Sequence, residues 1–270
     1  MTVLETIQKR RSVRTFDPSP LKEEDAQNIL QFASRVENPF DLPIRWKLLD
    51  AKKHSLSSPV IVGTDLYIAG KLPVAPHAEE AFGYTFEKVV LFAESLGVGT
   101  TWIAGTMNRS AFEKAMEVGK GEIMPCVSPL GYPSSKMTLR ETVMRKSIRA
   151  DSRLPFEELF FSGSFDRPLK KEEAGDLAPA LEAVRLGPSA VNRQPWRIVV
   201  GEDRRVHFFE KQNSGMADRG FDVQKIDLGI ALCHFEMVAA ENSLSPAFVL
   251  DPPALPVGEN MHYIASFALK

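Results

Sequence analysis

Residues 188–196 read Pro-Ser-Ala-Val-Asn-Arg-Gln-Pro-Trp and lead into the strand-like run of residues 196–200. The prolines fix backbone angles, while Ser189 and Asn192 present hydrogen-bonding groups from a loop before the predicted strand. A loop of this kind can line and orient a flat ring. The alternative is an ordinary turn between a helix and a strand, in which Asn192 bonds its own loop backbone. Trp196 is expected to anchor the core rather than to touch a ligand.

A short basic segment lies near the N-terminus, where residues 10–14 read Arg-Arg-Ser-Val-Arg just before a helix-like stretch. Guanidinium groups present fixed forks of donors that match phosphate oxygens, and a serine hydroxyl adds a neutral hydrogen bond. The candidate phosphate ligands are therefore Arg10, Arg11, Ser12 and Arg14. The alternative is a solvated basic run that precedes a helix.

The two halves of the chain share a pattern that predicts an internal duplication. Phe16-Asp17 and Pro20-Leu21-Lys22 in the first half correspond to Phe165-Asp166 and Pro168-Leu169-Lys170 in the second. A helix, a strand and a longer helix are predicted after each, at residues 26–33, 44–49 and 86–96 and at residues 177–184, 196–200 and 226–240. Chance likeness between amphipathic helices is the alternative. The duplication predicts two domains, 1–153 and 154–270.

Each half lacks one of the two candidate segments. Where the first half has its arginines, the second has Phe160-Phe161-Ser162-Gly163-Ser164, which contains no cation. Where the second half has residues 188–195, the first has an unrelated stretch at residues 36–45. If a site takes phosphate ligands from one half and a ring-lining loop from the other, both losses fall in the same site. One complete site per chain is then expected.

Together these segments resemble the nitroreductase family of FMN-dependent oxidoreductases. Members are homodimers in which one subunit binds the FMN phosphate and the other lays a Pro-Ser-x-x-Asn-x-Gln-Pro-Trp segment along the flavin ring. The resemblance implies an α+β fold with mostly antiparallel sheets flanked by helices, here as two fused copies that form an intrachain pseudo-dimer similar to the TM nitroreductases. It also implies that the flavin ring is lined by Pro188, Ser189, Ala190 and Asn192. The family usually has a second serine where this chain has Ala190, which puts one hydroxyl contact in doubt.

Two further segments of the first half resemble the family. Gly97 is placed to end a helix in a left-handed conformation, and a strand is expected after it. In the family, backbone N–H groups after this turn meet the flavin N5 and O4 region, which implies a cofactor role for Trp102, Ile103, Ala104 and Gly105. A helix end that feeds a core strand is the alternative. A late Lys or Arg often returns to the phosphate in the family, so Arg140 or Lys136 is a candidate ligand, with simple surface exposure as the alternative.

Composition excludes several classes of protein. With 270 residues and a net charge of -2, the chain can bury a sizeable core and offers no electrostatic case for nucleic acid or an anionic membrane. No segment approaches the roughly 20 apolar residues of a membrane span, and the opening run is too short for a secretory signal, so a cytoplasmic location is expected. Cys126 and Cys233 are far apart, and neither they nor the five histidines have metal-ligand spacing. We therefore expect no metal.

The resemblance implies a redox reaction carried by the cofactor. NADH or NADPH would deliver hydride to FMN and leave, so that a nitroaromatic, a quinone or a similar small electron acceptor could bind. No side chain is assigned to catalysis, because FMN carries the chemistry while the protein supplies orientation and electrostatics. The alternative is a non-catalytic protein that binds or senses flavin, or a degenerate paralogue that binds another ligand. A fused pair can complete its site as a monomer, and further association stays open.

Overall fold

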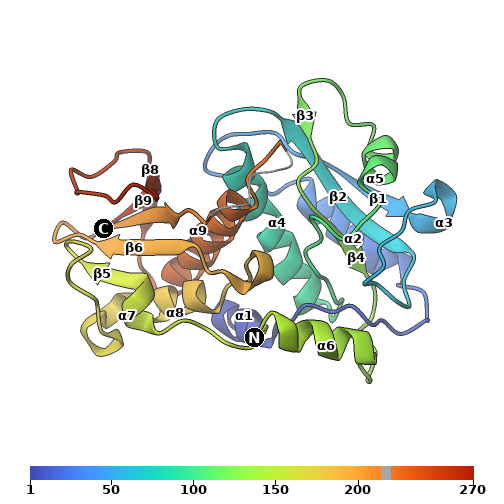
Figure 1. Ribbon diagram of the computed structural model, residues 1–270, viewed down its shortest axis with the longest axis horizontal. Helices are drawn as coiled ribbons and strands as arrows, with labels where there is room; N and C mark the ends of the chain where they lie inside the picture. The colour runs from blue at the N-terminus through green and yellow to red at the C-terminus, as the bar shows by residue number, and fades with distance from the viewer. Residues whose placement is uncertain (214–219) are drawn as a thin grey trace. The chain divides into compact units, whose positions relative to one another are not determined.

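The computed structural model describes residues 1–213 and 220–270 (Figure 1). The chain divides into two compact units, which we call the N-terminal unit, Lys9–Ala150, and the C-terminal unit, Asp151–Lys270 together with Met1–Gln8. The boundary lies a few residues before the predicted one at 153/154. Met1–Gln8 belong to the same compact unit as the second half, whereas the prediction places them in the first domain. Part of the physical reason is that the Val3 backbone N donates to Glu241 Oε1 at 2.8 Å.

The N-terminal unit is built around a four-stranded antiparallel sheet. Its central strand β2 pairs with all three others, with Arg45 opposite Lys71 and Leu66 opposite Leu130. The strands are β1 (Arg45–Asp50), β2 (Leu66–Pro73), β3 (Glu122–Ile123) and β4 (Val127–Leu130). The helices are α2 (Glu23–Ala33), α3 (Ala51–His54), α4 (Ala78–Ser95), α5 (Arg109–Met116) and α6 (Leu139–Ser147), and α1 (Val3–Lys9) crosses from the C-terminal unit at its last residue.

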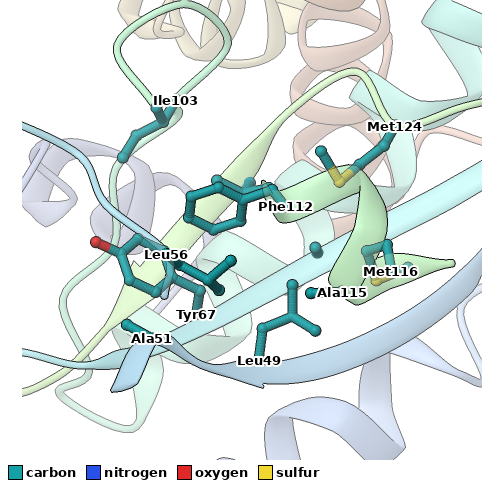
Figure 2. Close-up of a cluster of buried hydrophobic side chains, with 11 residues drawn as sticks. Leu49, Ala51, Leu56, Tyr67, Ile103, Phe112, Ala115, Met116 and Met124 are labelled. Atoms are coloured by element: carbon teal, nitrogen blue, oxygen red, sulfur yellow. The ribbon is translucent and has the colours of Figure 1, made fainter. Parts of the chain in front are cut away.

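A cluster of buried apolar side chains packs β1, β2 and α5 together (Figure 2). Tyr67 meets Phe112 edge to face with ring centroids 5.1 Å apart, a geometry that aromatic pairs prefer. Ile103, which is only 2% exposed, joins the same cluster from the segment after α4. The core therefore fixes the position of a segment to which the sequence assigns a cofactor role.

The C-terminal unit contains a five-stranded sheet in the order β5-β6-β7-β9-β8. Only β5 runs parallel to its neighbour, and the other pairs are antiparallel. The strands are β5 (Phe160–Ser162), β6 (Trp196–Val200), β7 (Arg205–Lys211), β8 (Pro246–Val249) and β9 (Met261–Leu269). The helices are α7 (Phe156–Leu159), α8 (Ala178–Leu186) and α9 (Val223–Glu241), with 3-10 turns η1 (Lys171–Glu173), η2 (Gly175–Leu177) and η3 (Ala190–Asn192).

The predicted helices and strands of both halves are confirmed. The predicted helices at 26–33, 86–96, 177–184 and 226–240 are α2, α4, α8 and α9, and the strands at 44–49 and 196–200 are β1 and β6. Each unit has the order helix, two antiparallel strands, long helix and further strands. The predicted order helix, strand, helix is therefore present in both units, and the duplication itself stays a prediction.

The strand predicted after Gly97 was wrong. Residues 100–105 form only isolated bridges, Ser12 with Thr100 and Ile103 with Val127. The Thr101 N–H donates to the Ser128 hydroxyl at 3.0 Å instead of to a backbone carbonyl, and Arg109 binds the Ala104 carbonyl at 2.7 Å. Because side chains bind these backbone groups, the regular backbone hydrogen bonding of a strand does not continue through this segment.

Three smaller features concern the predicted absences. Cys126 and Cys233 are both buried and free. Across residues 1–213 and 220–270, no group of His, Cys, Asp and Glu is arranged to hold a metal ion. Within the same ranges, no helix has the length and apolar character needed to cross a bilayer.

Candidate functional site

The basic segment is fixed to the core of the N-terminal unit by its backbone. The Val13 N donates to the Thr100 carbonyl at 2.8 Å, and the Phe16 N donates to the Val62 carbonyl at 2.8 Å. The Val13 side chain is 1% exposed. The arginines on either side of Val13 are therefore held by ordered chain, not by a free tail.

The three arginines of this segment are short of hydrogen-bond acceptors. Arg10 Nε lies 3.8 Å from Glu87 Oε1, and Arg11 Nη1 lies 3.7 Å from Glu141 Oε1. Both distances are too long for hydrogen bonds. One buried guanidinium nitrogen of each arginine, Arg10 Nε, Arg11 Nη1 and Arg14 Nη1, has no hydrogen-bond partner among the residues that the structure describes. Buried donors without acceptors are costly, and phosphate oxygens would supply the missing acceptors.

Helix α6 brings further charge to this cluster. Thr138 caps the helix by accepting from the Glu141 N at 3.2 Å, and the Thr15 hydroxyl donates to Glu141 Oε2 at 2.7 Å. Burial holds the pKa of Arg14 below its usual value, with the Glu141 carboxylate opposing the shift and the positive charge of Arg145 adding to it. Arg145 therefore lies close enough to Arg14 for their charges to interact.

Arg145 is thus a cation of α6 whose charge acts on Arg14, while the role assigned to Arg140 stays a prediction. Glu141 and Arg145 are four residues apart and share a face of the helix, whereas Arg140 is exposed and Lys136 lies exposed before the helix. Among the described residues, no side-chain hydrogen bond or ion pair joins Arg140 or Lys136 to the cluster. The signal available in the sequence was the spacing of Glu141 and Arg145 by one helical turn.

Glu87 connects the arginine cluster to the segment after α4. This carboxylate is 0% exposed, and its Oε2 accepts from Trp102 Nε1 at 3.0 Å while Oε1 faces Arg10. The Trp102 ring packs edge-on against Phe86, with centroids 4.7 Å apart. The structure therefore brings Arg10 and Trp102 together, as a single site requires. Sequence reasoning missed Glu87, although a carboxylate on the apolar face of a helix, between Phe86 and Val90, is a visible signal.

The segment after α4 offers backbone donors at some of the predicted positions. Gly97 has φ +73 and ends α4, as predicted. The Ile103 N–H donates to the Val127 carbonyl at 2.9 Å, and the Ile103 side chain packs in the buried cluster (Figure 2). Neither its N–H nor its side chain is therefore available to a ligand. Within the described ranges, no hydrogen bond uses the backbone N–H of Trp102 or Gly105. These two N–H groups fit the family's contact with the ring edge better than Ile103 does.

The loop at residues 188–194 of the C-terminal unit is held by hydrogen bonds from inside and outside. The Ser189 hydroxyl accepts from the Gln194 N at 2.9 Å, and Gln194 Oε1 accepts from the Leu154 N at 2.9 Å. Asp227 accepts from the Ala190 N with both oxygens, at 3.0 and 3.1 Å. The loop is consequently ordered around a fixed backbone path.

Asn192 and Trp196 differ in what they leave for a ligand. Asn192 Nδ2 donates to the Ser152 carbonyl at 3.1 Å. Trp196 is fully buried, which confirms its predicted role as a core anchor. Pro188, Ser189, Ala190 and Asn192 are each partly exposed. The predicted composite site draws the arginines and the Trp102 segment from the N-terminal unit and this loop from the C-terminal unit.

Comparison with known proteins places the chain in a family. The family described as "Putative TM nitroreductase" matches residues 2–239, and the chain belongs to this nitroreductase family. A structure described as a "putative nitroreductase" from Thermotoga maritima covers 100% of this chain and 94% of its own, with 22% identity and a TM-score of 0.64. The fold is therefore the nitroreductase-like α+β fold.

Shorter proteins match about half of the chain. An FMN-dependent nitroreductase from Clostridium difficile R20291 covers 49% of this chain and 88% of its own, with 17% identity and a TM-score of 0.43. A structure described as an NADH dehydrogenase/NAD(P)H nitroreductase from Parabacteroides distasonis covers 50% and 89%, with 22% identity and a TM-score of 0.42. No protein with curated function matches the sequence.

Proposed function

We propose that this chain is an FMN-dependent oxidoreductase that passes hydride from NADH or NADPH to a small acceptor such as a nitroaromatic or a quinone. The observation that carries the proposal is the set of three buried guanidinium nitrogens without acceptors, in a chain of the nitroreductase family. A phosphate monoester is the ligand chemistry that satisfies all three at once.

The charges of the N-terminal unit fit such a ligand. Arg10, Arg11, Arg14 and Arg145 outnumber the two buried carboxylates, Glu87 and Glu141, by two positive charges. A phosphate monoester carries about -1.5 to -2 near pH 7, because its second pKa is about 6. Binding of the phosphate would leave the cluster close to neutral, and buried charges cost least free energy when they are compensated.

Each part of the proposed site has a separate task. Arg10, Arg11, Ser12, Arg14 and Arg145 would hold the phosphate. The N–H groups of Trp102 and Gly105 would meet the ring edge, and Ala104 lies between them. The ring-lining residues would be Pro188, Ser189, Ala190 and Asn192, so that one composite site forms per chain from two fused copies. When bound, FMN supplies the hydride chemistry, and these residues orient the ring and limit the access of water.

The proposal is tested by purifying the chain and recording its absorbance in the flavin bands before and after incubation with FMN. We expect tight, stoichiometric flavin and oxidation of NADH or NADPH in the presence of menadione or a nitroarene. Colourless protein that cannot be reconstituted would contradict any flavin function.

A flavin-binding protein without turnover is the second candidate, and the replacement of the family's usual second serine by Ala190 favours it. The same preparation separates the two candidates. Bound FMN that NADH and NADPH both fail to reduce would support the binding protein over the enzyme. The cytoplasmic location and the absence of nucleic-acid partners remain predictions from composition.

A further inference from the structure

A buried carboxylate anchors the candidate ring-lining loop from inside the C-terminal unit. Asp227 lies in α9 and is 4% exposed, and both of its oxygens accept from the Ala190 N, at 3.0 and 3.1 Å. Ala190 belongs to the loop, and Asp227 follows it by 37 residues. A buried side chain of α9 thus binds the backbone of the loop directly.

The loop needs such support because its backbone is strained. Val191, Asn192 and Gln194 have φ values of +44, +59 and +51. This left-handed region is sterically unfavourable for residues with a side chain, most of all for those branched at Cβ, such as Val191. Residues persist in it only where surrounding contacts fix them, and strain of this kind is concentrated at ligand sites.

The surroundings of Asp227 make its charge expensive. Burial raises its pKa well above the usual value, the negative charges of Asp222 and Glu210 raise it further, and the Ala190 N–H opposes these effects. Asp222 precedes α9, and Glu210 comes from β7 and is 0% exposed. Both carboxylates thus act on the pKa of Asp227 in the same direction as its burial. A carboxylate held at such cost serves poorly as a simple stabiliser of the fold.

We propose that Asp227 is a positioning residue that holds the 188–194 loop in its ring-lining conformation by accepting from the Ala190 N. This inference rests on the proposed function, and it assigns to Asp227 no contact with the flavin. Flavin affinity should then depend on the charge of a side chain that acts through the loop.

The test compares FMN and riboflavin binding by wild-type protein, Asp227→Asn and Asp227→Leu. Because the leucine has no acceptor for the Ala190 N, we expect both flavins to bind on the order of tenfold more weakly. The asparagine keeps a neutral acceptor, so its loss should be smaller. The loop would contact the ring and not the phosphate, so the ratio of riboflavin to FMN dissociation constants should stay as in wild type.

Two measurements on flavin-free protein separate positioning from general damage. Hydrogen exchange at residues 188–194 should accelerate in Asp227→Leu. Asp227→Asn should unfold at the same or a higher denaturant concentration than wild type at neutral pH, because it removes a buried charge. Weaker flavin binding by a variant that is no less stable is a result that a merely structural role does not give.

The dependence on pH has a definite sign. Because the folded-state pKa of Asp227 is raised, lowering the pH protonates it before ordinary aspartates and weakens its bond to Ala190. The flavin affinity of wild type should therefore fall toward that of Asp227→Asn as the pH decreases, while the variant lacks this step.

Asp222→Asn is the matched control, since Asp222 is also buried and accepts from the Gln224 N at 2.9 Å, not from the loop. At a pH high enough for Asp227 to be ionised in both proteins, its flavin affinity should match wild type, while the fall in affinity at lower pH should begin at a lower pH, because the Asp222 charge no longer raises the pKa of Asp227. If wild type binds FMN, and Asp227→Leu binds FMN and riboflavin with the same affinities as wild type does, the inference is overturned and the proposed function stands. If wild type binds neither flavin, the proposed function itself fails.

Discussion

Arg10 and Glu87 show how single residues set the character of the N-terminal unit. Their side chains are 6% and 0% exposed and of opposite charge, and the carboxylate also accepts from the Trp102 indole. A buried ion is tolerable only with compensation, so each of these groups depends on the other. Affinity for an anion and stability of the empty fold are therefore linked at this pair.

Replacement of Glu87 by leucine should destabilise the flavin-free protein by about 3 kcal/mol. It leaves Arg10 buried without its counter-charge and the Trp102 N–H without its acceptor. Urea denaturation monitored by circular dichroism gives the free energy of unfolding. Glu80→Gln is the control, because Glu80 is 2% exposed on the same helix and its Oε2 has no hydrogen-bond partner among the described residues. Equal losses in the two variants would contradict the role given to Glu87.

The two arginines of α6 should behave differently toward FMN. Arg145→Ala should weaken FMN binding by roughly 1.5–3 kcal/mol, the value of one hydrogen bond to a charged group, and should leave riboflavin binding unchanged. Arg140→Ala is the matched control and should bind both flavins as wild type does. Fluorescence titration measures the four affinities. A larger effect at Arg140 than at Arg145 would contradict this expectation and support the assignment of Arg140 made from the sequence.

The doubled substitution Arg10→Ala with Arg14→Ala extends this comparison to the basic segment. If both guanidinium groups bind the phosphate, FMN affinity should fall by several kcal/mol, since each charge-assisted bond is worth roughly 1.5–3 kcal/mol. Riboflavin, which has no phosphate, is the internal reference. Unchanged FMN affinity would remove the phosphate assignment from both residues.

At the scale of elements, the turn after α4 joins a helix end to the basic segment. An added Cβ at Gly97 meets nothing within 4 Å, so only its φ of +73 disfavours a side chain there. At Gly99 an added Cβ would lie 2.9 Å from Val13 Cγ2. One glycine thus serves the backbone conformation, and the other allows a close approach of two segments.

Alanine substitutions at these glycines should separate stability from binding. Gly97→Ala should cost about 1 kcal/mol of unfolding free energy with unchanged FMN affinity, because only the left-handed conformation is penalised. Gly99→Ala should weaken FMN binding as well, since Val13 and its neighbouring arginines must shift. Parallel denaturation and titration of the two variants measure both effects. Identical FMN affinity in Gly99→Ala and wild type would contradict the coupling.

Most elements could be predicted from the sequence, because their apolar residues repeat with the period of a helix or form short strand-like runs. The exception at residues 100–105 reads as a strand by composition, but the side chains of Ser128 and Arg109 take its backbone groups, which no local pattern reveals. Asp227 was missed for a similar reason, as its partner Ala190 lies in another element. Arg145 was missed because the choice between two nearby cations depends on which face of α6 meets the core.

At the scale of the whole molecule, the complementary losses in the two halves predict one FMN per chain. Titration of flavin-free protein, followed by absorbance of the bound cofactor after gel filtration, should reach a plateau at about one equivalent. A symmetric pair of sites would bind two equivalents of FMN per chain. A plateau at two would show that the second half retains a site despite having no arginine at residues 160–164.

The assignment of Met1–Gln8 to the C-terminal unit means that the chain passes between the two units twice, at residues 8/9 and again at 150/151. Cutting the polypeptide at the second passage would not release two self-sufficient pieces, because fragment 1–150 would carry away an arm whose Val3 docks on Glu241. The same arm ends directly before Arg10, so the first covalent tether between the units runs into the proposed phosphate ligands. The covalent connection between the units and the proposed phosphate ligands therefore occupy neighbouring residues of the chain.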